Sequence, residues 1–279
     1  MPKLSDVVSV LEDLYPPQWA ESWDAVGLVC GAPEASTTRV LLAVDPVQAV
    51  VDEAVAWGAD LLVTHHPLYL RGTTSVAATT FKGRVVHTLI SNSIALHVAH
   101  TNADRAAPGV SDALAEAVGL RVTGPLAPDP DDPTGCRGTG RIGELPVPEP
   151  LAAFAARVAA GLPATAAGVR IAGAPDLMVS RVAVCGGAGD SLFAAVRAAG
   201  VDAFLTADLR HHPASEAYEA APVALIDAAH WATEWPWLRQ AGRDLATAAE
   251  KHGQALEIRV SQLVTDPWTA HAPMPYPTD

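Results

Sequence analysis

Cysteine is scarce in this sequence, which argues against a thiolate metal centre. The 279 residues include three cysteines, Cys30, Cys136 and Cys185, and they are far apart. They fit no zinc-site spacing, and one would remain if the other two formed a disulfide. This usage is typical of a protein from a reducing compartment. We interpret the cysteines as packing residues and expect a cytoplasmic protein.

Basic residues are also few. The 18 lysines and arginines are outnumbered by 31 aspartates and glutamates, which gives a formal net charge of -13. This charge has the wrong sign for a protein that holds nucleic acid through many phosphate contacts, so we do not expect nucleic acid as a partner. Bound divalent cations would reverse the sign locally.

The sequence contains no apolar run long enough to span a bilayer, and no membrane association is expected. Its composition is that of a globular protein, because 49% of the residues are hydrophobic and only 18% are charged. The length is sufficient for one large domain or for two smaller ones, each with a real core.

The most informative stretch is an apolar strand that ends in two histidines. Residues 60–64 have strand composition and lead directly into His65, His66 and Pro67. Neighbouring side chains on a strand point to opposite faces, so both imidazoles reach one ligand only if the strand stops there, and Pro67 is a fitting stop. In open α/β sheets this edge is where sites are built. Two surface histidines in a turn are the simpler alternative for an isolated pair.

The same strand closes a predicted βαβ unit. Residues 39–45 indicate a buried strand, residues 47–57 a helix with Gly58 as its left-handed cap, and residues 60–64 the second strand. A second copy of this pattern begins at an offset of 142 positions. The matching pairs are Arg39 and Arg181, Gly58 and Gly200, Asp60 and Asp202, and Thr64 and Thr206.

A further correspondence follows each copy. His100 and Asp104 stand four residues apart after one predicted strand, and His230 and Glu234 have the same spacing after another. We therefore predict an α/β fold with two similar lobes, produced by internal duplication, whose sheet edges face a shared cleft. Glycine, proline and aspartate crowd between residues 123 and 150, which places the lobe boundary there. The expected domains are residues 1–125, completed by residues 222–279, and residues 126–221.

Imidazoles and carboxylates without a thiolate suit zinc, iron, manganese, cobalt or nickel. A carboxylate can bridge two ions, so these residues predict two divalent metal ions per chain. His100 is expected to orient the ligands without contacting the ions itself, or to act as an occasional ligand. The predicted ligands are His65, His66, Asp104, His230 and Glu234.

The second copy of the repeat continues into more polar residues. Asp208, His211 and His212 are candidate catalytic residues that would bind substrate or transfer protons in the cleft. Satisfied polar groups at a lobe interface explain them equally well. The glycine-rich residues 186–189 follow a strand and open a helix, where backbone N–H groups could hold a phosphate, although a plain tight turn also explains them.

The C-terminal third gives weaker signals. Pro236 predicts that Glu234 precedes the following helix or lies in its irregular first turn. Trp235 and Trp237 could serve a subunit interface near the site. Residues 257–264 alternate like an edge strand, and the proline-rich tail from residue 266 is expected to be ordered only by docking on something else.

Several of these motifs together resemble the NGG-interacting-factor-three-like family, which includes the bacterial GTP cyclohydrolase 1 type 2 homologues. The resemblance runs from the first helix to about Gly253, and it implies two α/β lobes, a dinuclear metal centre and a ring-shaped homohexamer with sites facing an internal cavity. It also carries the ligand role onto the five residues named above. The motifs are residues 23–28, 64–67, 100–104, 186–189, 206–212 and 227–234.

Two functions from different classes remain open. The first is a metal-dependent hydrolase acting on a small nucleotide-like or phosphorylated substrate, with opening of the GTP ring as the named possibility. The second is a non-catalytic metal-binding scaffold or regulator that acts on a partner protein. An open coordination position favours the enzyme.

Overall fold

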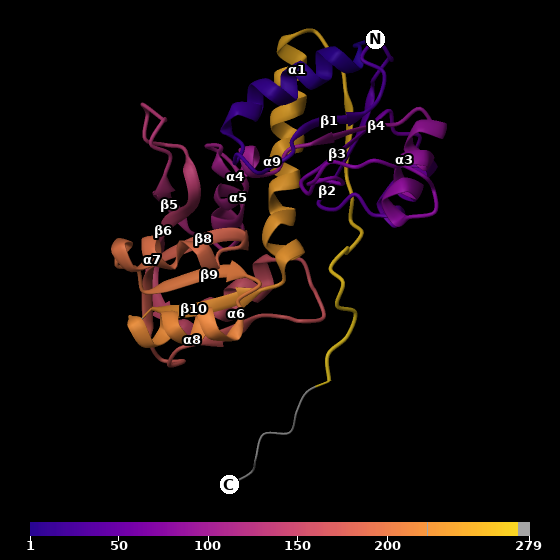
Figure 1. Ribbon diagram of the computed structural model, residues 1–279. Coiled ribbons are helices and arrows are strands. Elements are labelled where there is room, and N and C mark those ends of the chain that lie inside the picture. Colours follow the sequence, from indigo (N-terminus) through magenta and orange to yellow (C-terminus); the bar gives the residue numbers. More distant parts are fainter. Residues whose placement is uncertain (222, 273–279) are drawn as a thin grey trace.

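The computed structural model describes residues 1–221 and 223–272, and it contains two sheets connected by one long helix (Figure 1). The first sheet has the strand order β1-β4-β3-β2-β11. Strands β2, β3, β4 and β11 run parallel, and β1 is antiparallel to β4. Its strands are β1 (Gly27–Cys30), β2 (Arg39–Ala43), β3 (Leu61–Thr64), β4 (Ala95–Val98) and β11 (Glu257–Val260).

Both faces of the first sheet are buried, which explains why its strands read as continuous apolar runs. In β2, Val40 and Leu42 pack in the core that contains α1 and α9, while Leu41 packs on the other face against α2 and α3. The helices of this lobe are α1 (Leu4–Leu14), the short η1 (Pro17–Trp19), α2 (Gln48–Trp57), α3 (Phe81–Ser91), α4 (Thr101–Arg105) and α5 (Val110–Ala117).

The second sheet has the order β5-β6-β8-β9-β10-β7, with β8, β9 and β10 parallel. Its strands are β5 (Arg121–Pro128), β6 (Gly138–Pro150), β7 (Arg170–Ala172), β8 (Met178–Ala188), β9 (Ala203–Ala207) and β10 (Ala224–Ala228). The accompanying helices are α6 (Leu151–Gly161), η2 (Asp190–Leu192), α7 (Phe193–Ala199), α8 (His211–Ala220) and α9 (His230–Lys251). Helix α9 leaves the second lobe and runs along the first (Figure 1).

The predicted duplication is confirmed down to individual hydrogen bonds. Asp60 accepts from the backbone N–H of Arg39 at 2.9 Å, and Asp202 accepts from that of Arg181 at 2.8 Å. The guanidinium of Arg39 donates to the carbonyl of Trp57, and that of Arg181 donates to the carbonyl of Ala199. Each lobe thus contains three parallel strands linked by two helices, β2-α2-β3-α3-β4 and β8-α7-β9-α8-β10.

The lobes divide at different residues from those expected. All of β5 pairs in the second sheet, so a boundary after residue 125 falls inside that strand. Strand β10 pairs with β9 and β7 in the second sheet, whereas residues from 222 onward were expected in the first lobe. Backbone pairing therefore assigns β10 to the second lobe and only β11 to the first.

Other local expectations need correction. Cys185 is buried, but Cys136 is exposed and is not a packing residue. Trp235 and Trp237 are buried in their own chain, where their indole N–H groups donate to Ser261 and Tyr15, so they are not available for a subunit interface. Among residues 1–221 and 223–272, no helix combines the length and apolar character needed to cross a membrane.

Candidate metal centre

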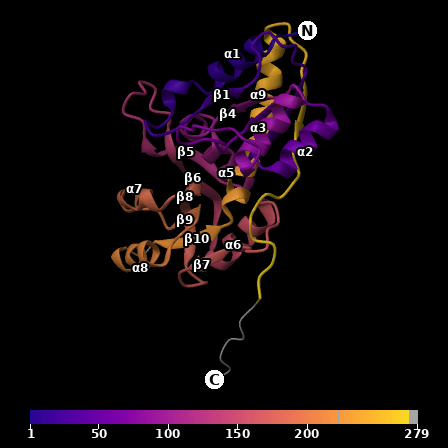
Figure 2. The ribbon, with the colours of Figure 1, turned by 45° about the vertical axis from the view of Figure 1, so that its right-hand side comes forward.

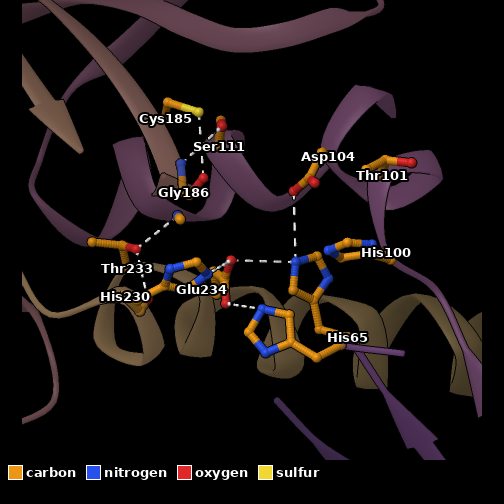
Figure 3. A network of polar contacts seen from close by, with 12 residues as sticks. His65, His100, Thr101, Asp104, Ser111, Cys185, Gly186, His230, Thr233 and Glu234 are labelled. Atoms are coloured by element: carbon orange, nitrogen blue, oxygen red, sulfur yellow. Dashed lines mark hydrogen bonds and ion pairs between the residues drawn. The ribbon is translucent and has the colours of Figure 1, made fainter. Parts of the chain in front are cut away.

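The carboxyl ends of parallel strands from both sheets meet at one cluster of histidines and carboxylates (Figure 3). His65 and His66 follow β3, and His100 follows β4 immediately before α4, which carries Asp104. His230 begins α9 directly after β10, and Glu234 lies one turn further along the same helix face. The structure therefore brings together all five predicted ligands and His100.

Glu234 lies at the centre of this cluster. Its Oε1 is 2.9 Å from Nε2 of His230 and 3.5 Å from Nε2 of His65. Its Oε2 is 3.1 Å from Nε2 of His66. One carboxylate thus faces imidazoles from both lobes with both oxygens, which is the arrangement that a bridging ligand requires.

The first-lobe residues extend the cluster to the other side of His65. Oδ1 of Asp104 lies 3.7 Å from Nε2 of His65. Ligand atoms of His65, His66 and His100 all lie within 4.8 Å of one another, and the same holds for His66, His230 and Glu234. His66 belongs to both groups, but its Nδ1 is bonded to Asp45, so its single Nε2 lone pair can ligate one ion only. His100 is as close to this centre as the predicted ligands.

Each imidazole is held in place through its other ring nitrogen. Nδ1 of His65 donates to the carbonyl oxygen of Ala99 at 3.0 Å. The other three donate to carboxylates, because an ionised carboxylate can only accept: His66 to Asp45 at 2.7 Å, His100 to Asp24 at 2.9 Å and His230 to Asp208 at 2.7 Å. In the neutral imidazole this pattern fixes the tautomer that leaves the lone pair on Nε2, and it is typical of metal-ligating histidines.

In the absence of a metal ion, protonated imidazoles balance the negative charge of the carboxylates in the cluster. Burial lowers the pKa of His230, but the negative charge of Glu234 and hydrogen bonds to Glu234 and Asp208 outweigh burial and raise it to about 9. The pKa of His66 is raised well above its ordinary value in the same way. Burial raises the pKa of Glu234, yet the surrounding imidazolium charges hold it well below its ordinary value. Glu234 is therefore ionised at neutral pH.

The atoms at the centre also fit a metal ion. Among the described residues, Nε2 of His65 and Oε2 of Glu234 are buried and form no hydrogen bond. Leaving buried polar atoms unsatisfied costs about 1–3 kcal/mol each, and a shared cation would satisfy them. The donors are imidazole nitrogens and carboxylate oxygens, which suit zinc and the first-row transition metals.

Three residues of the centre could not be assigned from the sequence argument. Asp24 and Asp45 hold histidines, although neither has a histidine nearby in the sequence. Gly187 lies directly against the cluster: a Cβ at this position would be 2.5 Å from Oε1 of Glu234 and 3.0 Å from Nε2 of His230. The glycine run therefore makes room for ligands. The backbone N–H groups of Gly186 and Gly187 donate to Ser111 and Thr233, so they are not free to hold a phosphate.

The candidate catalytic residues lie around the cluster rather than inside it. Asp208 contacts the centre by accepting the hydrogen bond from His230. His211 and His212 are exposed at the start of α8, and neither belongs to the groups of possible ligands found among the described residues.

The fold and the cluster define a class: two-lobed α/β proteins whose facing sheet edges gather histidines and carboxylates that can bind metal. Within that class, the sequence profile of the Duf34/NIF3 (NGG1p interacting factor 3) family matches residues 2–267, and the chain belongs to this family. The resemblance drawn from the motifs is thereby confirmed.

Relatives and solved structures agree with this assignment. A "GTP cyclohydrolase 1 type 2 homolog" of Streptomyces coelicolor is 65% identical over 271 residues, covering 97% of this chain and 95% of the relative. A protein of the same name from Mycobacterium tuberculosis is 42% identical, with 95% and 96% of the two chains covered. The crystal structure of a Bacillus cereus protein related to NIF3 superposes with a TM-score of 0.88 at 25% identity, covering 96% and 98%.

Proposed function

We propose that this protein is a metal-dependent hydrolase with two divalent ions per chain, acting on a nucleotide-like or phosphorylated small molecule. The observation that carries the proposal is the position of Glu234, a buried carboxylate facing three imidazoles from two lobes. The name shared by its relatives, GTP cyclohydrolase 1 type 2 homolog, supports a nucleotide as the substrate class.

His65, His66, Asp104, His230 and Glu234 would hold the ions, and His100 is close enough to join them. Bound divalent ions would supply a water molecule of lowered pKa and polarise the bond that it attacks. Asp45 and Asp208 keep the Nε2 atoms of His66 and His230 directed at the centre. We propose that the exposed His211 and His212 contact the substrate away from the ions or transfer protons to solvent.

The test is metal reconstitution followed by an activity screen. The protein is loaded separately with zinc, manganese, cobalt, nickel and iron(II), then assayed against GTP and simple phosphoesters. We expect activity with at least one metal, and its loss in Asp104→Ala and Glu234→Ala. His211→Ala should retain its metal and lose turnover, whereas His252→Ala, an exposed histidine at the far end of α9, should behave as the wild type.

No hydrolysis with any of these metals, despite stoichiometric metal binding, would contradict the hydrolase function and favour a metal-binding scaffold or regulator.

We also propose that the chain forms a cytoplasmic homohexamer whose sites face an internal cavity, on the strength of the family resemblance. Sedimentation at moderate salt tests the assembly, because a mass near 28.9 kDa, that of one chain, would reject it.

A further inference from the structure

The C-terminal segment after β11 is attached to both lobes. Residues 261–272, here called the strap, leave the first lobe and run to the level of the second (Figures 1 and 2). At its start, the hydroxyl of Ser261 donates to Glu53 in the first lobe at 2.6 Å. Near its end, Nδ1 of His271 donates to the carbonyl oxygen of Ala166 in the second lobe at 2.6 Å. The tail from residue 266 was expected to be ordered only by docking on something else. Its residues 266–272 dock on their own chain, and residues 273–279 lie outside the described residues.

The strap also forms a hydrogen bond to one of the residues that hold the predicted ligands in place. The hydroxyl of Thr265 donates to Oδ2 of Asp45, and Oδ1 of the same carboxylate accepts from Nδ1 of His66. One side chain thus connects the strap to a predicted ligand. This contact fixes the position of the strap relative to the metal centre.

Between these attachments the strap forms one wall of a pocket that reaches His230. The pocket has a volume of about 560 Å³, within the range of small-molecule sites. Asp208 and His230 line it on the side of the metal centre, and Asp266 and Trp268 line it from the strap. A molecule bound here would lie against the metal centre and the strap at the same time.

Two strap residues have properties that call for a ligand. Asp266 is 9% exposed, and its Oδ2 has no hydrogen-bond partner among the described residues. A buried carboxylate oxygen without a donor is costly, so a ligand N–H group in the pocket would satisfy it. Trp268 is 69% exposed although it lines the same pocket, which leaves an indole surface on which a flat ring can stack.

We propose that the strap forms the specificity wall of the substrate site, where Trp268 stacks on a heteroaromatic ring and Asp266 accepts a hydrogen bond from an amino group of that ring. The ligand class is therefore an aminated heteroaromatic such as guanine. This inference rests on the proposed function for its location beside the metal centre, but it concerns binding and not turnover.

The experiment measures binding of guanosine and inosine to the metal-loaded full-length protein by calorimetry. Inosine lacks the exocyclic amino group of guanosine, so it isolates the contact with Asp266. We expect the wild type to bind guanosine about 10-fold more tightly than inosine. Asp266→Ala should remove that preference, and Trp268→Ala should weaken both nucleosides about 10-fold. Val264→Ala, an exposed strap residue outside the pocket, is the matched control and should change neither affinity.

The metal content of every variant is measured in parallel, because the strap inference requires it to be unchanged in Trp268→Ala. Guanosine affinity that is unaffected by Trp268→Ala and Asp266→Ala would overturn the inference, and so would a wild type that does not bind guanosine. A Trp268→Ala variant with altered sedimentation and unaltered affinity would also overturn it. Strap-dependent binding without hydrolysis would support the inference and contradict the proposed function. Hydrolysis of GTP that is unchanged in Trp268→Ala and Asp266→Ala would support the proposed function and contradict the strap inference.

Discussion

At the scale of single residues, the centre depends on what surrounds the ligands as much as on the ligands. Glu234 can face three imidazoles only because Gly187 leaves the space beside it empty. Gly187 also has a φ of +67°, a conformation that side chains with a Cβ rarely adopt. Both the backbone and the contact therefore require glycine at this position.

We predict that Gly187→Ala loses at least one metal ion while the fold persists. The added methyl group would lie 2.5 Å from Oε1 of Glu234 and must displace the carboxylate or the backbone. Gly200→Ala is the matched control, because Gly200 has a similar φ of +59° with nothing within 4 Å of the added Cβ. Both variants should share a strain cost of about 1 kcal/mol. Elemental analysis distinguishes them, and equal metal content in the two would contradict the role of Gly187.

A second residue-scale prediction concerns pH. A metal ion binds neutral imidazole, and the raised pKa of about 9 means that His230 is protonated at neutral pH in the metal-free protein. Metal affinity should therefore fall as the pH drops below 9, by about tenfold per unit for each proton displaced. Calorimetric titration with Mn²⁺ at pH 6.5, 7.5 and 8.5 measures this slope. An affinity that is constant across this range would show that no proton is displaced.

The stability of the metal-free protein should have the opposite dependence. Because the folded pKa of His230 lies above the unfolded value of about 6.5, its stabilising contribution is complete below pH 6.5 and is lost as the pH rises through 9. The depressed pKa of Glu234 gives a contribution that is present above about pH 4.5 and is lost as the pH falls. Urea unfolding in the presence of a chelator at a series of pH values follows both effects.

At the scale of elements, the sequence predicted what depends on strand ends and missed what depends on tertiary contacts. His65 and His66 were found because an apolar strand stops at Pro67. Asp24 was not assigned a role, because 76 positions separate it from its partner His100 and no local pattern records that contact. Glu234 was expected ahead of a helix or in an irregular first turn, yet α9 is continuous from His230 past Pro236. Burial of Trp231, Trp235 and Trp237 stabilises this helix more than local propensity opposes it.

The repeated unit gives a prediction that separates folding from metal binding. Asp60 accepts hydrogen bonds from Thr38 and Arg39, and Asp202 accepts them from Ser180 and Arg181. Each aspartate lies at the start of a strand, at the opposite end from the metal centre. Asp60→Ala and Asp202→Ala should each cost about 1–3 kcal/mol of unfolding free energy, and the costs should add because the sites lie in different lobes.

Metal content should stay at the wild-type level in both variants and in the double variant. Asp52→Ala, an exposed aspartate on α2, should change the urea midpoint little and serves as the control. If removing either aspartate released metal, the strand starts and the strand ends would not be independent parts of the lobe.

At the scale of the whole molecule, α9 joins the lobes through the candidate metal centre. Its first turns supply His230 and Glu234, and Trp237 further along packs on His65 with ring centroids 5.3 Å apart. Internal duplication explains why the two strand edges carry similar chemistry. The sequence predicted this two-lobed arrangement from matching spacings. The path of the strap could not be predicted, because it is set by contacts with both lobes that no local pattern in the sequence records.

Because the ligands come from both lobes, metal binding should stabilise the molecule as a unit. A ligand that binds only the folded state at 100 times its dissociation constant adds about 2.7 kcal/mol. For a chain of this size we expect a rise in Tm of roughly 5–10 °C when the chelator-treated protein is reloaded with metal. Glu234→Ala should lose most of this rise, since it removes the carboxylate that both lobes' imidazoles face. His211→Ala should keep the whole rise, because that residue lies exposed on α8.

A single cooperative transition that moves with metal would show that the centre joins the lobes, whereas a shift confined to one of two separate transitions would show that only one lobe binds the metal.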